Sequence, residues 1–202
     1  MQYTDRLIAT YEKYAHKRTA NAADSFKEVE KEVFKKYLVA EKRQAILEVG
    51  CGPGYDAKSF QEQGLRILAI DNTPAMVELA KEKGVPAQML DCYDLEQIDA
   101  TFDAVYSMNC LLHVPQKDLG QIFHLLSDRL NERGLMYLGL WGGEDFEGVW
   151  QQDPYEPKRF FSLRSAKTLF SAAQQLFRVE YYRRIEANDG DSFFNSLIVR
   201  KR

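Results

Sequence analysis

Short apolar runs alternate with amphipathic stretches along most of the chain. Each apolar run is shorter than an ordinary helix, and the first three end at a glycine or an acidic residue, which is typical of a strand buried on both faces. In the amphipathic stretches apolar residues recur with helical spacing. The predicted strands are 45–49, 65–70, 87–90, 102–107, 135–140, 179–185 and 193–200, and the predicted helices are 56–63, 74–83, 117–130 and 164–177.

This alternation predicts an α/β fold: a Rossmann-like, doubly wound and mostly parallel sheet with helices on both faces. The last two strands flank Asn188-Asp189-Gly190, which favours a tight turn, so we expect the sheet to end in a C-terminal antiparallel hairpin. Residues 1–44 show helical spacing, with Phe26, Val33 and Tyr37 among the apolar positions, and are predicted to form an N-terminal helical cap.

The chain of 202 residues reads as a single domain, since it has no internal repeat, low-complexity tract or linker. Residues 142–163 are rich in glycine, proline, acids and aromatics, and so long an irregular segment inside a compact domain is often a functional lid. The expected parts are the helical cap 1–44, a ligand-binding core 45–141, the lid-like insertion 142–163, and a C-terminal helix and hairpin 164–202.

Composition narrows the function classes. The 27 Lys and Arg residues against 30 Asp and Glu give a net charge of −3, which does not favour nucleic-acid binding. No signal peptide is expected at the N-terminus, and no apolar stretch approaches the ~20 residues of a membrane span. The three cysteines lack paired spacing, which predicts reduced thiols and a cytoplasmic protein. The cysteines and three histidines are scattered, so we expect no metal site; a monomer and a homodimer both remain open.

The segment from Glu48 to Gly54, Glu-Val-Gly-Cys-Gly-Pro-Gly, lies between the first predicted strand and the following helix. Ligands of doubly wound sheets bind at such carboxyl ends, where glycines let a ligand approach the backbone. A dinucleotide fingerprint would need a glycine where Tyr55 stands, and no phosphate-loop motif is present. Glu48 also suits a cationic ligand better than a pyrophosphate. A nicotinamide-dependent oxidoreductase is therefore disfavoured.

Acidic residues follow the next two predicted strands. Asp71 comes about 20 residues after the glycines, where a carboxylate can accept hydrogen bonds from ribose hydroxyls. Asp91 follows the third strand, where an acceptor could meet an exocyclic amine. Taken singly, Asp71 could instead cap the next helix, and Asp91 could be a turn residue. Together with Glu48 they form a rim that fits a ligand with an amino-acid end, a ribose and an adenine.

These blocks resemble the class I S-adenosylmethionine-dependent methyltransferases, especially the branch that acts on small molecules. The resemblance covers residues 45–141 in four successive motifs: the glycine loop, the acid after the second strand, Asp91-Cys92, and Phe102–Ser107 running into Leu111–Val114. It implies a seven-stranded sheet ending in a reversed hairpin. It also implies S-adenosylmethionine as cofactor and S-adenosylhomocysteine as product.

Family roles carried onto matching positions give a cofactor site. The glycine loop would pack against the methionine part, Asp71 would hold the ribose, and Ser107 would lie near the sulfonium. Glu48 would orient the loop or bind near the amino group. The residues implied to bind the cofactor are Glu48, Gly50, Cys51, Gly52, Gly54, Asp71, Asn72, Met76, Asp91, Cys92 and Ser107, together with Tyr14 (or Tyr11) closing over it from the cap.

The sequence gives fewer indications of which residues bind the methyl acceptor. His113 follows the fourth strand and is the candidate catalytic residue, since a histidine there could remove a proton; alternatively it is a structural turn residue. Trp141 and Arg159 are the candidate substrate-binding residues, with Arg164 a second guanidinium that could clamp a carboxylate. Otherwise the aromatics of this region anchor a long loop to the core.

The resulting hypothesis is an enzyme that transfers a methyl group to a small-molecule acceptor by direct in-line displacement. Positioning can supply most of the acceleration in such a reaction. A methyltransferase acting on protein or nucleic acid, and a non-catalytic cofactor-binding protein, are the alternatives. The site after the fourth strand reads Asn109-Cys110-Leu111-Leu112, without the Asn/Asp-Pro-Pro-aromatic tetrad of nucleic-acid amino methylation, which disfavours the nucleic-acid alternative.

Overall fold

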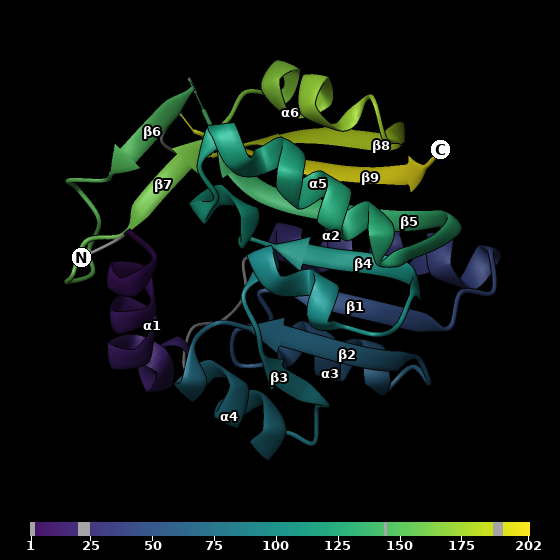
Figure 1. The fold of residues 1–202 in the computed structure, drawn as a ribbon, viewed down its shortest axis with the longest axis horizontal. Helices are drawn as coiled ribbons and strands as arrows, with labels where there is room; N and C mark the ends of the chain where they lie inside the picture. Colours follow the sequence, from purple (N-terminus) through teal and green to yellow (C-terminus); the bar gives the residue numbers. More distant parts are fainter. Residues whose placement is uncertain (1–2, 20–24, 144, 188–191) are drawn as a thin grey trace.

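Seven strands of the chain form one sheet in the order β3-β2-β1-β4-β5-β9-β8 (Figure 1). The structure is a computed structural model that describes residues 3–19, 25–143, 145–187 and 192–202. The strands of this sheet are β1 (Ala45–Val49), β2 (Arg66–Asp71), β3 (Ala87–Met89), β4 (Phe102–Met108), β5 (Leu130–Gly142), β8 (Phe177–Glu186) and β9 (Phe193–Lys201).

Strand directions confirm the predicted fold class. Strands β1 to β5 pair in parallel, and β9 runs antiparallel to both β5 and β8. The C-terminal hairpin is therefore present, although its predicted turn Asn188-Asp189-Gly190 lies outside the described residues. Parallel strands place their carboxyl ends on one edge of the sheet, which is where the glycine loop and both acids were expected.

Helices cover both faces because each strand buries side chains alternately on either side. One face packs against α2 (Ser25–Ala40), α3 (Tyr55–Gln61) and α4 (Pro74–Glu82), and the other packs against α5 (Leu119–Asp128) and α6 (Ala166–Ala173). Short 3-10 helices, η1 (Cys92–Gln97), η2 (Leu111–His113) and η3 (Gln116–Asp118), complete the second side.

The predicted helical cap splits into two helices with different places. Helix α1 (Tyr3–Thr19) lies beyond the carboxyl ends of the parallel strands (Figure 1). Helix α2 instead packs on the sheet, since Phe34 and Leu38 are fully buried against Ile46 and Tyr106. Only α1 is thus placed to cover a ligand.

The expected lid-like segment contains regular structure. Strands β6 (Phe146–Val149) and β7 (Phe160–Leu163) form a separate two-stranded antiparallel ribbon. Neither strand has the long alternation that predicts a strand from sequence, and Gly148 interrupts the first one. Across the described ranges, no helix combines the length and apolar character needed to cross a bilayer.

Glu30 ties α2 to the C-terminal hairpin. Its side chain is fully buried and accepts hydrogen bonds from Tyr181 Oη at 3.0 Å, Arg183 Nη1 at 3.0 Å and Ser196 Oγ at 2.6 Å. A buried carboxylate is tolerated only when such donors replace water. Glu30 therefore fixes the hairpin against a helix far away in the sequence.

We expect Glu30→Ala to lower the free energy of unfolding by about 2–4 kcal/mol, because it leaves the buried Ser196 hydroxyl and the half-buried Tyr181 hydroxyl without their acceptor. Urea denaturation followed by circular dichroism measures this change. Glu32→Ala on the same helix is the control: Glu32 is 55% exposed and pairs only with Lys35, so a change within about 0.5 kcal/mol is expected. Equal effects of the two substitutions would contradict the assignment.

Candidate cofactor-binding site

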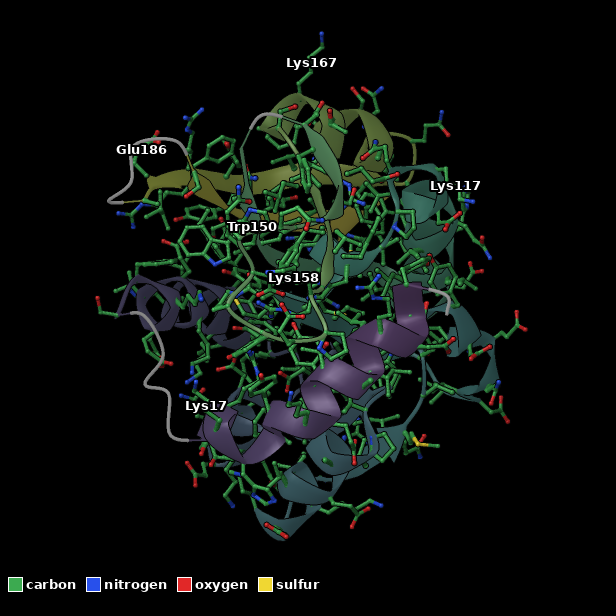
Figure 2. The ribbon with its side chains drawn as sticks, turned by 90° about the vertical axis from the view of Figure 1, so that its left-hand side faces the viewer. Lys17, Lys117, Trp150, Lys158, Lys167 and Glu186 are labelled. Carbon is green, nitrogen blue, oxygen red and sulfur yellow. The ribbon has the colours of Figure 1, made fainter. Side chains whose placement is uncertain are left out.

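A cavity lies between the carboxyl ends of the parallel strands and helix α1. Figure 2 looks onto this end of the molecule, where α1 crosses the face beneath the segment that carries Trp150 and Lys158. The sequence-predicted residues that line the cavity are Gly50, Gly52, Asp71, Asn72, Met76, Asp91, Cys92 and His113. The structure thus brings together residues from the ends of β1, β2, β3 and β4.

The glycine loop is held against the neighbouring strand by its own backbone. The N–H groups of Gly50 and Cys51 both donate to the carbonyl of Ile70, at 2.8 and 2.9 Å. Gly50 and Gly52 have φ angles of +77° and +50°, the left-handed region that favours glycine. A Cβ on Gly50 would come within 2.4 Å of Cys110 Cβ, whereas one on Gly52 would meet nothing within 4 Å. Gly50 is therefore required for packing, and Gly52 leaves open space beside the backbone.

Asp71 connects this loop to the start of α4. Its Oδ2 accepts from the Gly52 N–H and its Oδ1 from the Thr73 N–H, both at 2.9 Å. Burial raises the pKa of the Asp71 carboxyl, and the two backbone donors oppose that rise. Each carboxylate oxygen keeps a lone pair beyond these bonds, so Asp71 can still accept from a ligand hydroxyl.

Asp91 joins the other predicted residues of the rim. Its Oδ2 accepts from Asn72 Nδ2 at 2.8 Å, and its Oδ1 caps η1 by accepting from the Tyr93 N–H at 3.1 Å. Asp91 is therefore a turn residue, as one of its two interpretations predicted. The same side chain also lines the cavity. Asn72 is oriented by this contact, which leaves its amide oxygen on the opposite side.

Seven predicted site residues do not line the cavity: Glu48, Cys51, Gly54, Ser107, Tyr14, Trp141 and Arg159. Glu48 lies in β1 between Leu47 and Val49, so its side chain points to the α2 and α3 side of the sheet. There it accepts a hydrogen bond from the Ala57 backbone. Burial, and then the nearby Asp56, hold the pKa of Glu48 well above its usual range. The contacts observed for Glu48 are with the start of α3.

Gly54 and Cys51 of the glycine loop have packing roles. Gly54 has a φ of +80°, and a Cβ there would lie 2.7 Å from Ala80 Cβ, so the loop packs closely on α4. The Cys51 thiol is buried, and this burial raises its pKa far above the usual range, so it stays protonated. Ser107 is also buried, at the end of β4.

The predicted substrate residues are held by neighbouring side chains. Trp141 packs edge-on against Phe26 and Phe194, with ring centroids 5.8 and 5.5 Å apart. Arg159 makes a bidentate ion pair with the buried Asp153, at 2.9 Å from both Nε and Nη2. The Arg159 guanidinium is therefore already matched to a carboxylate of the chain itself.

Arg164 and Tyr14 are likewise internal contacts. The Arg164 guanidinium is buried and donates to the carbonyls of Leu111 and Val114, which closes the turn after β4. Tyr14 stacks on Tyr155 with ring centroids 4.6 Å apart. Of the two cap tyrosines considered from the sequence, Tyr11 lines the cavity and Tyr14 does not.

His113 lines the cavity with both ring nitrogens engaged. Nδ1 lies 2.7 Å from the Phe160 carbonyl oxygen, and Nε2 lies 2.8 Å from Tyr11 Oη. Burial lowers the pKa of His113 to about 3, and the positive charges of Arg159 and Arg18 act in the same direction. The imidazole is therefore neutral at physiological pH and occupied on both sides, which favours a structural role over proton removal.

Sequence reasoning missed several residues of the cavity. Tyr3, Leu7 and Arg18 come from α1, and Asn109 follows β4 with a φ of +54° and a buried Oδ1 that has no partner among the described residues. The α1 residues lie on one broad face of the helix, so their spacing is a usable signal. Without knowing that α1 covers the sheet edge, the sequence could not assign that face to a ligand.

Arg18 stands out among the cavity residues. Within the described ranges its guanidinium has no hydrogen bond or ion pair; it lies over the Tyr11 ring, 5.1 Å from the centroid. Arginines rarely face a cavity without an acceptor, because five donors are then left to water or ligand. Arg18 is thus available to an anionic group.

Comparison with known proteins agrees with this geometry. Residues 46–134 match a family model described as a methyltransferase domain. The resemblance drawn from the four sequence motifs is confirmed over this range.

In the described part of the chain, no group of three or more His, Cys, Asp or Glu residues could hold a metal ion.

Relatives and solved structures extend the comparison. The chain is 32% identical over 77 residues to a ubiquinone biosynthesis O-methyltransferase of Xylella fastidiosa, a match that covers 35% of this chain and 31% of that protein. It is 28% identical over 99 residues to the malonyl-[acyl-carrier protein] O-methyltransferase of Serratia marcescens, covering 46% and 38%. The aligned part thus spans about a third of the length of these relatives.

The fold match is more extensive than the sequence match. The crystal structure of Burkholderia thailandensis 1,6-didemethyltoxoflavin-N1-methyltransferase, with its substrate and S-adenosylhomocysteine bound, superimposes with a TM-score of 0.77. This superposition covers 99% of this chain and 89% of the other at 17% identity. Almost the whole chain, including α1 and the hairpin, therefore shares the fold of that methyltransferase.

The two cavity glycines should respond differently to alanine. Gly52→Ala should cost about 1–2 kcal/mol of stability through its positive φ alone. Gly50→Ala adds a clash with Cys110 and should cost about 2–5 kcal/mol in total. Thermal and urea denaturation of both variants measure the difference. Equal destabilisation would contradict the close contact between the loop and Cys110.

Proposed function

We propose that the chain is an S-adenosylmethionine-dependent methyltransferase that transfers a methyl group to a small-molecule acceptor. The observation that carries the proposal is the cavity at the strand ends. It brings the open backbone of Gly52, the buried carboxylate of Asp71 and the acceptor oxygens of Asp91 to one place.

The residues of the cavity fit the proposed cofactor part by part. Asp71 retains lone pairs for ribose hydroxyls, and the open side of Gly52 lets a ligand lie against the loop. Asp91 and the orphaned Asn109 Oδ1 can accept from amino groups. Two separate hydrogen-bond acceptors, Asp91 and Asn109, suit a ligand that carries both an exocyclic amine and an ammonium group.

We assign Arg18 to the carboxylate of the cofactor's amino-acid end. It is the cavity guanidinium without a partner among the described residues, and α1 ends beside the glycine loop, since Tyr55 Oη donates to the Thr19 carbonyl at 3.0 Å. A charge-assisted hydrogen bond there would give α1 a direct part in cofactor binding. Cofactor binding and closure of the cavity by α1 would then be linked.

When bound, S-adenosylmethionine supplies a methyl group already activated by its sulfonium. The chain's part is to hold that group in line with a nucleophile and to exclude water, and positioning of this kind can contribute up to ~7–11 kcal/mol. Helix α1 contributes one side of the cavity, and the segment that follows β6 holds α1 in place through Thr10 and Lys13. The lowered pKa of His113 makes it a weak base and Tyr11 already faces its Nε2, so the proposal includes no dedicated base among the residues described.

A small acceptor is supported by the enclosure of the cavity. Helix α1 contacts Pro157 and Glu156 through Thr10 and Lys13, so the opening lies beneath a helix rather than in an exposed groove. The relatives named above include an O-methyltransferase of ubiquinone biosynthesis. The cysteines Cys51, Cys92 and Cys110 are free thiols, which fits the proposed cytoplasmic location.

A screen of metabolites with methyl-labelled cofactor tests the proposed activity. Binding of the cofactor without any methylated product would leave only a cofactor-binding protein.

We expect Asp71→Ala to weaken S-adenosylhomocysteine binding about 10- to 100-fold, since hydrogen bonds to a charged group contribute about 1.5–3 kcal/mol. Isothermal titration calorimetry measures the affinity. Asp99→Ala, at an exposed position outside the cavity, should bind like the wild type. An unchanged affinity of the Asp71 variant would remove this residue from the proposed site.

Arg18→Gln should weaken S-adenosylhomocysteine binding about tenfold or more. It should leave the affinity for 5′-methylthioadenosine, which lacks the amino-acid end, within about twofold. Lys17→Gln, next to it and exposed, is the matched control (Figure 2). Equal losses for both ligands would show that Arg18 acts through α1 and not on a carboxylate.

A further inference from the structure

The hydrogen-bond chain around Tyr11 has a fixed direction. The Phe160 carbonyl can only accept, so His113 Nδ1 must carry the proton in their 2.7 Å contact. A neutral imidazole has one N–H, and burial keeps the His113 ring neutral, which leaves Nε2 without a proton. Tyr11 therefore donates its single hydroxyl proton to Nε2 across 2.8 Å.

Arg159 fixes the other side of the Tyr11 hydroxyl. Its Nη1 donates to Tyr11 Oη at 3.0 Å, while Nε and Nη2 are held by the buried Asp153. A guanidinium has no acceptor. Tyr11 thus donates to His113 and accepts from Arg159, and its oxygen retains one lone pair and no free proton.

Tyr11 and His113 both line the cavity, on the side formed by α1 and η2. Because the Tyr11 hydroxyl already donates its proton to His113, it can only accept a hydrogen bond from a ligand. The partner that satisfies it must therefore carry an O–H or N–H group. An ether, an ester oxygen or a tertiary amine would place a lone pair against another lone pair.

We propose that Tyr11 recognises the methyl acceptor by accepting a hydrogen bond from its O–H or N–H group, with His113 and Arg159 as the positioning residues that set this polarity. The inference rests on the proposed function and names the class of its substrate. When the O–H or N–H group of the methyl acceptor donates its hydrogen bond to Tyr11, the lone pair of that oxygen or nitrogen points away from the phenol. A hydroxyl that is methylated releases its proton to solvent water and with it loses this hydrogen bond, so the methylated product binds more weakly than the substrate.

The proton direction is tested first by nitrogen NMR of protein labelled with 15N-histidine. His16 and His124 are exposed, so the double variant His16→Gln, His124→Gln leaves His113 as the only histidine signal. We expect the neutral tautomer protonated on Nδ1 throughout pH 5.5–8. The tautomer protonated on Nε2, or an imidazolium in this range, would overturn the inference.

Ligand polarity is tested on protein loaded with S-adenosylhomocysteine. The probes are phenol with anisole and aniline with N,N-dimethylaniline, pairs that differ in whether the donor is methylated, titrated by saturation-transfer NMR. Wild type should bind each free form at least about tenfold more tightly than its methylated partner. Tyr11→Phe should reduce that ratio to about twofold or less, because it removes the accepting oxygen and keeps the ring.

Tyr14→Phe is the matched control on the same helix, since the Tyr14 ring stacks on Tyr155 and does not line the cavity. It should keep the wild-type ratio. The inference is overturned if wild type does not prefer the free forms, if none of the four probes binds, or if Tyr11→Phe keeps the preference. Failure of the wild type to take up S-adenosylhomocysteine would instead remove the proposed function itself.

Discussion

The site depends on the bond between the Gly52 N–H and Asp71 Oδ2, 2.9 Å long, which fastens the glycine loop to the end of the neighbouring strand. Together with the Gly50 and Cys51 amides on the Ile70 carbonyl, it shapes the turn between β1 and α3. The other Asp71 oxygen holds the start of α4. One buried carboxylate thereby sets the distance between two loops, and the cavity lies between them.

Much of this arrangement could be predicted from sequence because it is local. A strand, a turn and a helix fix where Gly50 lies, and parallel pairing brings Asp71 and Asp91 to the same edge. The direction of the Glu48 side chain also follows from the strand pattern: alternate residues of a strand face opposite sides, and Glu48 faces α3.

Other features depend on contacts distant in sequence and could not be derived locally. Tyr11 and Tyr14 are both on α1, and only the packing of that helix decides that Tyr11 meets His113 while Tyr14 meets Tyr155. Arg159 lacked a visible partner in the sequence, yet the fold of its loop supplies Asp153. The unpaired Arg18 became informative only once its neighbours were known.

We propose above all that the strand-end cavity binds an adenosyl amino acid through its glycine loop and carboxylates. The decisive measurement is a calorimetric titration of the purified, ligand-free wild-type protein with S-adenosylhomocysteine. We expect saturable binding of one molecule per chain. Absence of measurable heat at millimolar ligand, with the protein folded by circular dichroism, would contradict it.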